Sequence, residues 1–185
     1  MAGTARSLSR SGVMLGIAAM TVIVTASNVA VGFPINDWLT WGAFTYPISF
    51  LVTDLTNRSL GPAPARRVVY AGFAVAVLLS AIAAGPRIAA ASGLAFLLAQ
   101  LMDIAIFDRL RRAAWWRAPF VSSTLASALD TAVFFTLAFA GTGLPWTTWA
   151  LGDYGVKAAM ALAMLLPFRA LMGSIQAKPV VNARP

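Results

Sequence analysis

Four ionisable residues stand inside long apolar stretches of this sequence: Asp103, Asp130, Asp153 and Lys157. A charged side chain near the centre of a bilayer costs about 2.5 to 3.5 kcal/mol on insertion scales, so such residues are functional candidates by default. Each needs a partner, a ligand or water. Asp153 and Lys157 are four residues apart and lie on one helix face, so they can pair with each other. Structural pairing alone is therefore the competing interpretation for these two.

Other polar and aromatic residues share helix faces with these charges. Asp130 lies on one face with Ser127 and Phe134 and has no cation on its own helix, while Gln100 and Asp103 alternate with aromatic residues on another helix. Acids, amides, an amine and flat rings together suit a planar, hydrogen-bonding heterocycle. A guanine-like edge presents adjacent N–H donors that one carboxylate, Asp130 or Asp103, can accept, while aromatic rings stack on the base. The candidate substrate-binding residues are Asn28, Trp41, Thr45, Gln100, Asp103, Ser127, Asp130, Asp153 and Lys157. The alternative for this set is a buried hydrogen-bond network in which small polar residues help helices to pack.

The remaining three acids have ordinary structural interpretations. Asp54 is followed four residues later by Arg58, and Asp108 precedes Arg111 at helical spacing, which indicates local ion pairs at the membrane edge. Asp37 precedes an apolar run, where an acid caps a helix. We expect all three to be peripheral.

The residue inventory excludes several classes of chemistry. The chain has no His and no Cys, and all six of its acids are Asp. Ordinary zinc and copper sites, Ser-His-Asp triads, thiolate nucleophiles and iron-sulfur clusters all need residues that are missing. We therefore expect no catalytic residues, no metal and no cofactor, and we expect that the protein is not an enzyme.

The elements that carry these residues are apolar runs of membrane-spanning length. The chain has 185 residues, of which 59% are hydrophobic and 11% charged, which excludes a soluble globule. A helix crosses about 30 Å of hydrocarbon with roughly 20 residues. Six such runs occur, joined by short connections, with Pro47 and Pro167 interrupting the second and the sixth. The sequence thus predicts an all-α polytopic membrane protein, one bundle over residues 1–185, with helices at about 12–33, 38–57, 67–84, 87–107, 119–140 and 149–172.

The basic residues alternate between connections and so predict an orientation. Twelve of the 14 Arg and Lys residues fall in the N-terminal tail, the second-to-third and fourth-to-fifth connections and the C-terminal end. Because cytoplasmic loops keep Arg and Lys, both termini are predicted to be cytoplasmic. The formal charge of +8 then reflects topology and contact with the lipid bilayer rather than binding to nucleic acid. A cleaved signal peptide, with residues 24–26 as a small-residue site, is the alternative for the first run, but it would leave an odd number of spans.

Short motifs of a recognisable kind follow one another along most of the chain. They include residues 25–28, 40–44, 53–56, 61–67, 87–89, 100–103, 107–111, 115–119, 127–135 and 153–157, with prolines at 47 and 167. Together they resemble the queuosine precursor transporters, also called the vitamin-uptake-type family. The resemblance implies uptake of 7-deazaguanine bases, such as 7-cyano-7-deazaguanine (preQ0), across the bacterial inner membrane for salvage into tRNA queuosine. Residues 57–61 depart from the Glu-containing sequence that many relatives have there, which leaves any role for that Glu in doubt.

Two other functional classes remain as alternatives. A substrate-binding subunit of an energy-coupling-factor uptake system is also a small six-helix protein, and Ala26 and Ala30 are a weak hint of its docking face. The chain has no phosphate-binding loop, so any ATP dependence would come from a partner. An intramembrane Asp- and metal-dependent transferase is remote, because Asp103 and Asp108 are five residues apart with no dense Asp cluster around them. Energy coupling by a proton on Asp130 or Asp103, facilitated diffusion, and homo-oligomerisation all stay open.

Overall fold

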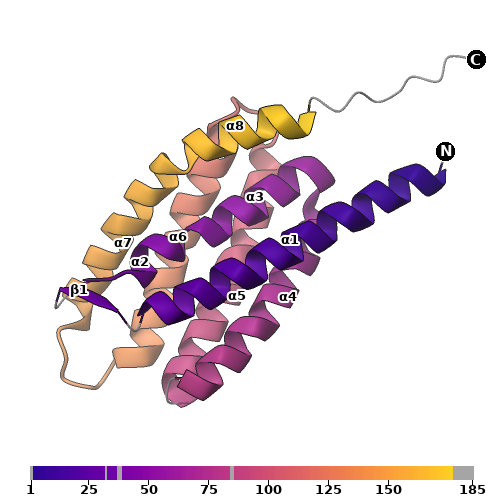
Figure 1. Ribbon diagram of the computed structural model, residues 1–185. Coiled ribbons are helices and arrows are strands. Elements are labelled where there is room, and N and C mark those ends of the chain that lie inside the picture. Colours follow the sequence, from indigo (N-terminus) through magenta and orange to yellow (C-terminus); the bar gives the residue numbers. More distant parts are fainter. Residues whose placement is uncertain (1, 32, 37–38, 84–85, 177–185) are drawn as a thin grey trace, which may run out of the picture.

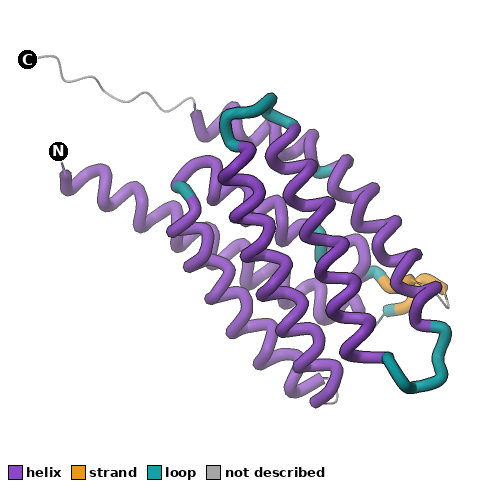
Figure 2. Tube along the Cα trace, turned by 180° about the vertical axis from the view of Figure 1, so that it is seen from behind, coloured by secondary structure: helices purple, strands orange, loops and turns teal. Residues whose placement is uncertain are grey.

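The protein is a bundle of helices with one short β-hairpin. The computed structural model describes residues 2–31, 33–36, 39–83 and 86–176. Long helices lie alongside one another in both views (Figures 1 and 2), which confirms the predicted all-α fold class. In chain order the elements are α1 (Ala2–Val31), β1 (Pro34–Asn36), β2 (Leu39–Thr40), α2 (Gly42–Thr45), α3 (Ile48–Leu60), α4 (Pro62–Ala83), α5 (Pro86–Leu110), α6 (Arg117–Phe139), α7 (Trp146–Ala163) and α8 (Leu165–Gln176).

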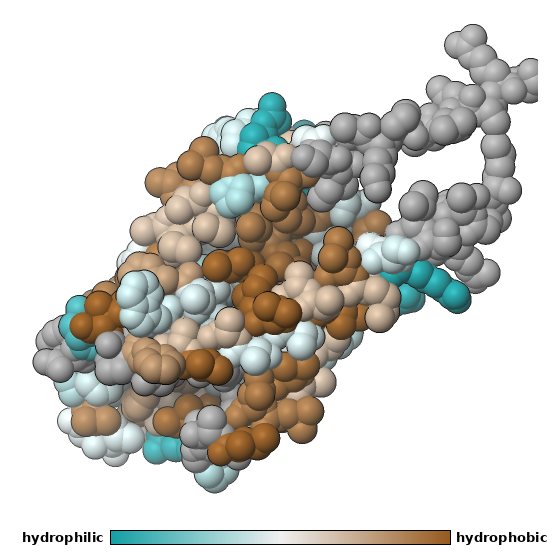
Figure 3. Space-filling view, in the orientation of Figure 1, coloured by the Kyte–Doolittle hydropathy of each residue, from teal (hydrophilic) through white to brown (hydrophobic). Residues whose placement is uncertain are grey.

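Five spans are long and apolar enough to cross a membrane. Within the described residues they lie in Arg10–Ser27, Pro62–Leu79, Pro86–Leu110, Arg117–Phe139 and Trp146–Gly173. Large apolar side chains are exposed along these helices, such as Ile82 at 86% and Leu166 at 78% of their accessible surface. Hydrophobic residues accordingly cover much of the face in Figure 3. Such a surface would be unfavourable in water and is the one expected against lipid.

The second predicted span differs most from its expected form. The sequence predicts a helix over about 38–57, kinked at Pro47. Instead β1 pairs antiparallel with β2, the short α2 follows, and α3 starts only at Ile48. Pro47 has no N–H to donate to the carbonyl of Ala43, and its ring clashes with the preceding turn, so the helix breaks there. The turn before Pro47 is itself helical, with the Thr45 N–H bonded to the Trp41 carbonyl, so the interruption is confined to the residues next to Pro47.

The sixth predicted span is interrupted as expected. The helix breaks at Met164, between α7 and α8, three residues before Pro167. Pro167 cannot donate to the carbonyl of Ala163, which removes one hydrogen bond from the turn at the break. Both interrupted spans thus have a proline at the break.

The two described chain ends lie at one end of the bundle (Figure 1), together with the α3–α4 and α5–α6 connections. There, Arg58 donates from Nη1 to the carbonyl of Arg111 at 2.8 Å, and Arg111 donates to the Asn57 carbonyl at 2.7 Å. Arg111 also forms the predicted ion pair with Asp108, at 2.9 Å. We call this the basic end, after Arg58, Arg66, Arg67, Arg109, Arg111, Arg112 and Arg117. That it faces the cytoplasm stays a prediction from the positive-inside rule.

Gly72 marks the tightest contact between α1 and α4. A Cβ atom on Gly72 would collide with the Met20 side chain and touch the ring of Phe96, both fully buried. We expect Gly72→Val to destabilise the protein by about 1 to 3 kcal/mol, because overpacking forces neighbours out of their rotamers. The measurement is thermal unfolding in detergent. Gly152→Val is the matched control, since nothing lies within 4 Å of its Cβ position. Equal melting temperatures for the two variants would contradict the close contact.

Candidate functional site

A large cavity lies in the half of the bundle that carries the β-hairpin. Its volume is about 710 Å³, and it is lined by residues of α1, the hairpin, α2, α4, α5, α6 and α7. Small-molecule sites in proteins span about 300 to 1,000 Å³. We call it the outer cavity. It has room for a ligand the size of a nucleobase and is open to the surface.

Three charged residues on two helices form the polar part of this cavity. Lys157 Nζ on α7 contacts Asp130 Oδ2 on α6 at 2.7 Å and Asp153 Oδ2 one turn earlier on α7 at 2.5 Å. The predicted pairing of Asp153 with Lys157 is therefore confirmed, and Asp130 finds its cation on the neighbouring helix. We call these residues the charged trio. When all three are ionised, the trio carries one net negative charge.

Neutral hydroxyl groups complete the hydrogen bonding of the charged trio. Tyr46, next to the break before α3, donates its OH to Asp130 Oδ1 at 2.9 Å. Thr131 donates its Oγ1–H to Asp153 Oδ2 at 2.8 Å and accepts from Lys157 Nζ at 3.3 Å. The side chains of Lys157 and Asp130 are only 6% and 7% exposed, against 19% for Asp153. The trio is thus a fixed, nearly buried set of charges with Asp153 as its most accessible member.

Aromatic side chains form another part of the wall of the outer cavity. Phe134 lies one helical turn after Asp130, with its ring centroid 5.2 Å from that of Phe135. Phe139 meets Trp149 edge to face at 5.8 Å. These rings bring flat apolar surface close to buried charge, a combination that suits a planar polar ligand. The aromatic wall consists of Phe96, Phe134, Phe135, Phe139 and Trp149.

Sequence reasoning missed three residues of this site. Tyr46 was missed because its partner, Asp130, lies on another helix, 84 residues further along the chain. Thr131 follows Asp130 directly in the sequence, and a hydroxyl group next to an intramembrane acid could have indicated that it belongs to the site. Ser27 lines the outer cavity, is 3% exposed, and its hydroxyl has no hydrogen-bond partner among the described residues. An unsatisfied buried hydroxyl in a cavity wall is available to a ligand or to water.

Several predicted site residues do not line the outer cavity. The Trp41 side chain is 57% exposed, and Thr45 donates its hydroxyl to the carbonyls of Trp41 and Gly42 in its own turn. The side chain of Asn28 lies outside the part of the chain that the structure describes, as do Asp37 and Trp38. Trp41 and Thr45 keep the four-residue helical spacing predicted for them, since the Thr45 N–H donates to the Trp41 carbonyl, but neither residue lines the cavity.

Gln100 belongs to a buried network rather than to the cavity wall. It is fully buried, donates from Nε2 to Ser49 Oγ at 2.9 Å, and accepts from Thr53 Oγ1 at 2.6 Å. Both partners lie on α3, so Gln100 joins α5 to α3. For this residue the arrangement matches the alternative of a buried hydrogen-bond network.

The expectation that Asp54 is peripheral and pairs with Arg58 is wrong. Asp54 is only 3% exposed, and its carboxylate accepts from Ser122 at 3.5 Å and Ser123 at 3.2 Å. Arg58 instead donates to a carbonyl at the basic end. Asp103, one of the three acids predicted to lie within the membrane, is 3.4 Å from the same Ser123 hydroxyl.

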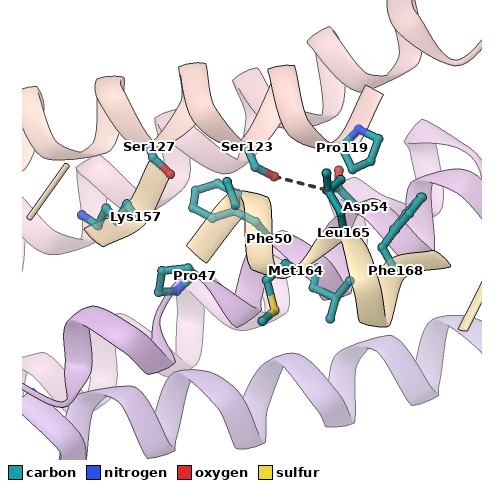
Figure 4. A pocket seen from close by; sticks show the side chains of 12 residues that line it. Pro47, Phe50, Asp54, Pro119, Ser123, Ser127, Lys157, Met164, Leu165 and Phe168 are labelled. Atoms are coloured by element: carbon teal, nitrogen blue, oxygen red, sulfur yellow. Dashed lines mark hydrogen bonds between the residues drawn. The ribbon is translucent and has the colours of Figure 1, made fainter. Parts of the chain in front are cut away.

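A second, narrow space lies between the charged trio and the half of the bundle nearer the basic end. Its volume is about 10 Å³, at the lower limit for one water molecule. Figure 4 shows Lys157 and Ser127 toward one end of it and Asp54, Leu165 and Phe168 toward the other. We call it the inner passage; it is closed to any ligand that the outer cavity holds. Among the predicted site residues, it is lined by Ser127 and Lys157.

Comparison with known proteins gives one family. Residues 40–85 and 80–172 match the family described as "Putative vitamin uptake transporter". The Queuosine precursor transporter of Escherichia coli (strain K12) is 34% identical over 175 residues, covering 79% of each chain. The Probable queuosine precursor transporters of Haemophilus influenzae and Bacillus subtilis are 32% and 27% identical, covering 80% and 68% of this chain and 73% and 68% of their own. No solved structure matches this chain.

Proposed function

This chain belongs to the family described as "Putative vitamin uptake transporter", and we propose that it imports queuosine precursors, 7-deazaguanine bases such as preQ0, for salvage into tRNA queuosine. It is a multi-pass membrane protein of the bacterial inner membrane, with transporters rather than enzymes as relatives. The relatives' names supply the substrate class. The choice of preQ0 within that class comes from the motif resemblance and is part of the proposal.

The observation that carries the proposal is the net negative charged trio beside an aromatic wall. The guanine-like edge of a 7-deazaguanine has a ring N–H and an amino group that both donate in one direction. Asp130 and Asp153 are acceptors, and Lys157 balances only one of their two charges. Hydrogen bonds to a carboxylate contribute about 1.5 to 3 kcal/mol each. The Lys157 ammonium has three N–H donors, and the one that makes the long 3.3 Å contact with Thr131 can turn to the ring carbonyl of the base, while the aromatic rings supply stacking surface.

The proposal assigns the substrate-contacting roles to a small set of residues. Asp130 and Asp153 accept from the base, Lys157 donates to it, and Phe134 on the next turn of α6 stacks on it. The free Ser27 hydroxyl on α1 is a further contact. Ser127 lines the inner passage, where it meets the base on its way through.

A transport cycle follows from the two spaces and the predicted orientation. With the basic end in the cytoplasm, the outer cavity faces the periplasm and the closed inner passage faces the cytoplasm. This geometry corresponds to an outward-facing state. Import requires the inner passage to widen while the outer cavity closes. The breaks at Pro47 and Met164 both line the inner passage. At these breaks α3 can move relative to α2, and α8 can move relative to α7.

The direct test is restoration of queuosine in the tRNA of a bacterial strain that can neither make nor import the precursor. Cells that express this chain and receive low external preQ0 are expected to contain queuosine, and cells with the empty vector are not. Mass spectrometry of tRNA nucleosides is the readout. A strain with this protein in its membrane but no queuosine would contradict the proposed function.

Purified protein distinguishes a self-sufficient carrier from a subunit of an energy-coupling-factor system. We expect proteoliposomes that contain only this chain to take up preQ0 without nucleotide. Uptake that appears only after an ATPase partner is added would favour the subunit interpretation.

A further inference from the structure

A second group of buried acids lies apart from the charged trio. Asp54 on α3 and Asp103 on α5 are 3% and 0% exposed. Ser123 Oγ on α6 lies 3.2 Å from Asp54 Oδ2 and 3.4 Å from Asp103 Oδ1, so both carboxyl groups face the same hydroxyl. We call Asp54 and Asp103 the acidic pair. It joins three helices in the half of the bundle nearer the basic end.

The hydrogen-bond donors around the acidic pair are too few for two carboxylates. The Ser123 hydroxyl has one proton and faces both acids, so it can satisfy only one of them. Ser122 Oγ lies at 3.5 Å from Asp54 Oδ1 and at 3.4 Å from the carbonyl of Pro119, so its proton is also shared. Asp103 Oδ2, fully buried, has no donor at all among the described residues. One further proton, held on the pair itself, would supply the missing donor.

The cations of the neighbouring elements are engaged elsewhere. On α7, Lys157 is held by Asp130 and Asp153, while Arg58 at the end of α3 donates to the Arg111 carbonyl. Arg169 on α8 lies over the ring of Trp115, and α6 contributes only hydroxyl groups at this level. The described cations of α1 and α4 are exposed: Arg10, Arg66 and Arg67. Within the described residues, no cation forms an ion pair with Asp54 or Asp103. Two adjacent ionised carboxylates without a cation in an apolar interior repel strongly, whereas one shared proton removes the repulsion.

We propose that the acidic pair is a proton-binding site and that its proton is the coupling ion for import. The inference rests on the proposed function and deepens it. Asp54 lines the inner passage, where its hydrogen bond from Ser123 spans the gap between α3 and α6 (Figure 4). With the proton bound, α3 stays against α5 and α6 and the passage is closed. Loss of the proton toward the basic end leaves two like charges, which separate α3 from its neighbours and open the passage.

Helix α3 connects this site to the charged trio. Tyr46, just before the start of α3, donates to Asp130, and Asp54 lies two turns further along the same helix. A base that binds Asp130 competes for the acceptor that Tyr46 uses. Substrate binding and proton release therefore both act on the position of α3, which is the requirement for coupling.

The test measures accumulation of preQ0 in proteoliposomes at a clamped membrane potential, with the basic end inside. For one proton per base, an inward gradient of one pH unit is expected to give about a tenfold accumulation, since one pH unit is a tenfold ratio of protons. The Asp54→Asn, Asp103→Asn double variant keeps the size and hydrogen-bonding capacity of both side chains. It is expected to equilibrate preQ0 without accumulation. Asp108→Asn, at the exposed basic end, is the matched control and is expected to accumulate like the unaltered protein.

The outcomes separate this inference from the proposed function. Uptake by the unaltered protein that ignores the pH gradient, or that follows a sodium gradient instead, overturns the proton site and leaves the import function standing. Absence of any preQ0 uptake overturns the import function. A double variant that still accumulates tenfold overturns the acidic pair as the site. A second readout needs no variant: uptake by the unaltered protein must make the outer medium alkaline, and uptake without this change overturns the inference.

Discussion

A Lys157→Met variant is expected to lose preQ0 uptake completely and to be recovered from the membrane in lower yield. Lys157 is the cation of two nearly buried carboxylates, Asp130 and Asp153. Removing one partner of a buried ion pair costs about 3 to 5 kcal/mol, because the remaining charge is left without compensation. That cost is a large part of the stability of an ordinary domain. Fluorescence size-exclusion of the solubilised protein measures the yield, and uptake into proteoliposomes measures the activity.

A neutral version of the charged trio separates folding from binding in this experiment. The triple variant Lys157→Met, Asp130→Asn, Asp153→Asn has no unpaired charge, so its yield is expected to approach that of the unaltered protein. Its uptake is expected to stay absent, because both the donor and the acceptors for the base are gone. Uptake by the single variant above a tenth of the normal rate would show that Lys157 has no part in the cycle. Recovery of uptake in the triple variant would remove the whole trio from the site.

Asp130→Asn is expected to weaken preQ0 binding by about 10- to 150-fold while leaving the protein folded. The change removes one carboxylate and keeps an oxygen that accepts from Tyr46. Lys157 retains Asp153 as its counter-charge, so no buried charge is stranded. The magnitude is that of one charge-assisted hydrogen bond, about 1.5 to 3 kcal/mol. Competition against labelled preQ0 at equilibrium gives the affinity.

An altered ligand shows whether Asp130 contacts the base directly. The unaltered protein is expected to bind preQ0 far better than the analogue that lacks the amino group of the guanine-like edge, because that analogue leaves an acceptor unused. Asp130→Asn is expected to bind the two ligands with similar affinity. Equal loss for both ligands in the variant would assign Asp130 a structural role instead. Ser59→Ala, at an exposed hydroxyl near the basic end, is the control that should leave both affinities unchanged.

Contacts between residues of one helix could be predicted from the sequence, whereas contacts between residues of different helices could not. Spacing of four residues along one helix was enough to predict that Asp153 pairs with Lys157. Asp130 meets the same ammonium from a position 27 residues away on α6. No helical periodicity relates two residues on different helices, so this contact required the packing of α6 against α7. The number and composition of the apolar spans predicted the fold class because bilayer thickness constrains them directly.

Asp54 and Pro47 illustrate how a local pattern can mislead. The four-residue spacing of Asp54 and Arg58 allows an ion pair on one helix. Instead, the hydroxyl groups of Ser122 and Ser123 on α6 donate to the Asp54 carboxylate. For Pro47, the difficulty was the extent of the disruption. A proline in a predicted span indicates a kink or a break, and the sequence alone does not distinguish them. In the structure α2 and α3 are separate elements, but the turn from Trp41 to Tyr46 remains helical.

The interrupted spans also bear on how long the protein survives outside its membrane. A proline inside a membrane helix is tolerated because neighbouring helices satisfy the backbone groups it frees. A detergent micelle confines the helices laterally less than a bilayer does. Unfolding in detergent is therefore expected to begin at the two breaks, between α2 and α3 and between α7 and α8. Substitutions that make the helix continuous at both breaks are expected to slow the unfolding of the protein in detergent. The same substitutions are expected to lower the transport rate, because stabilising a hinge commonly reduces the activity that depends on its movement.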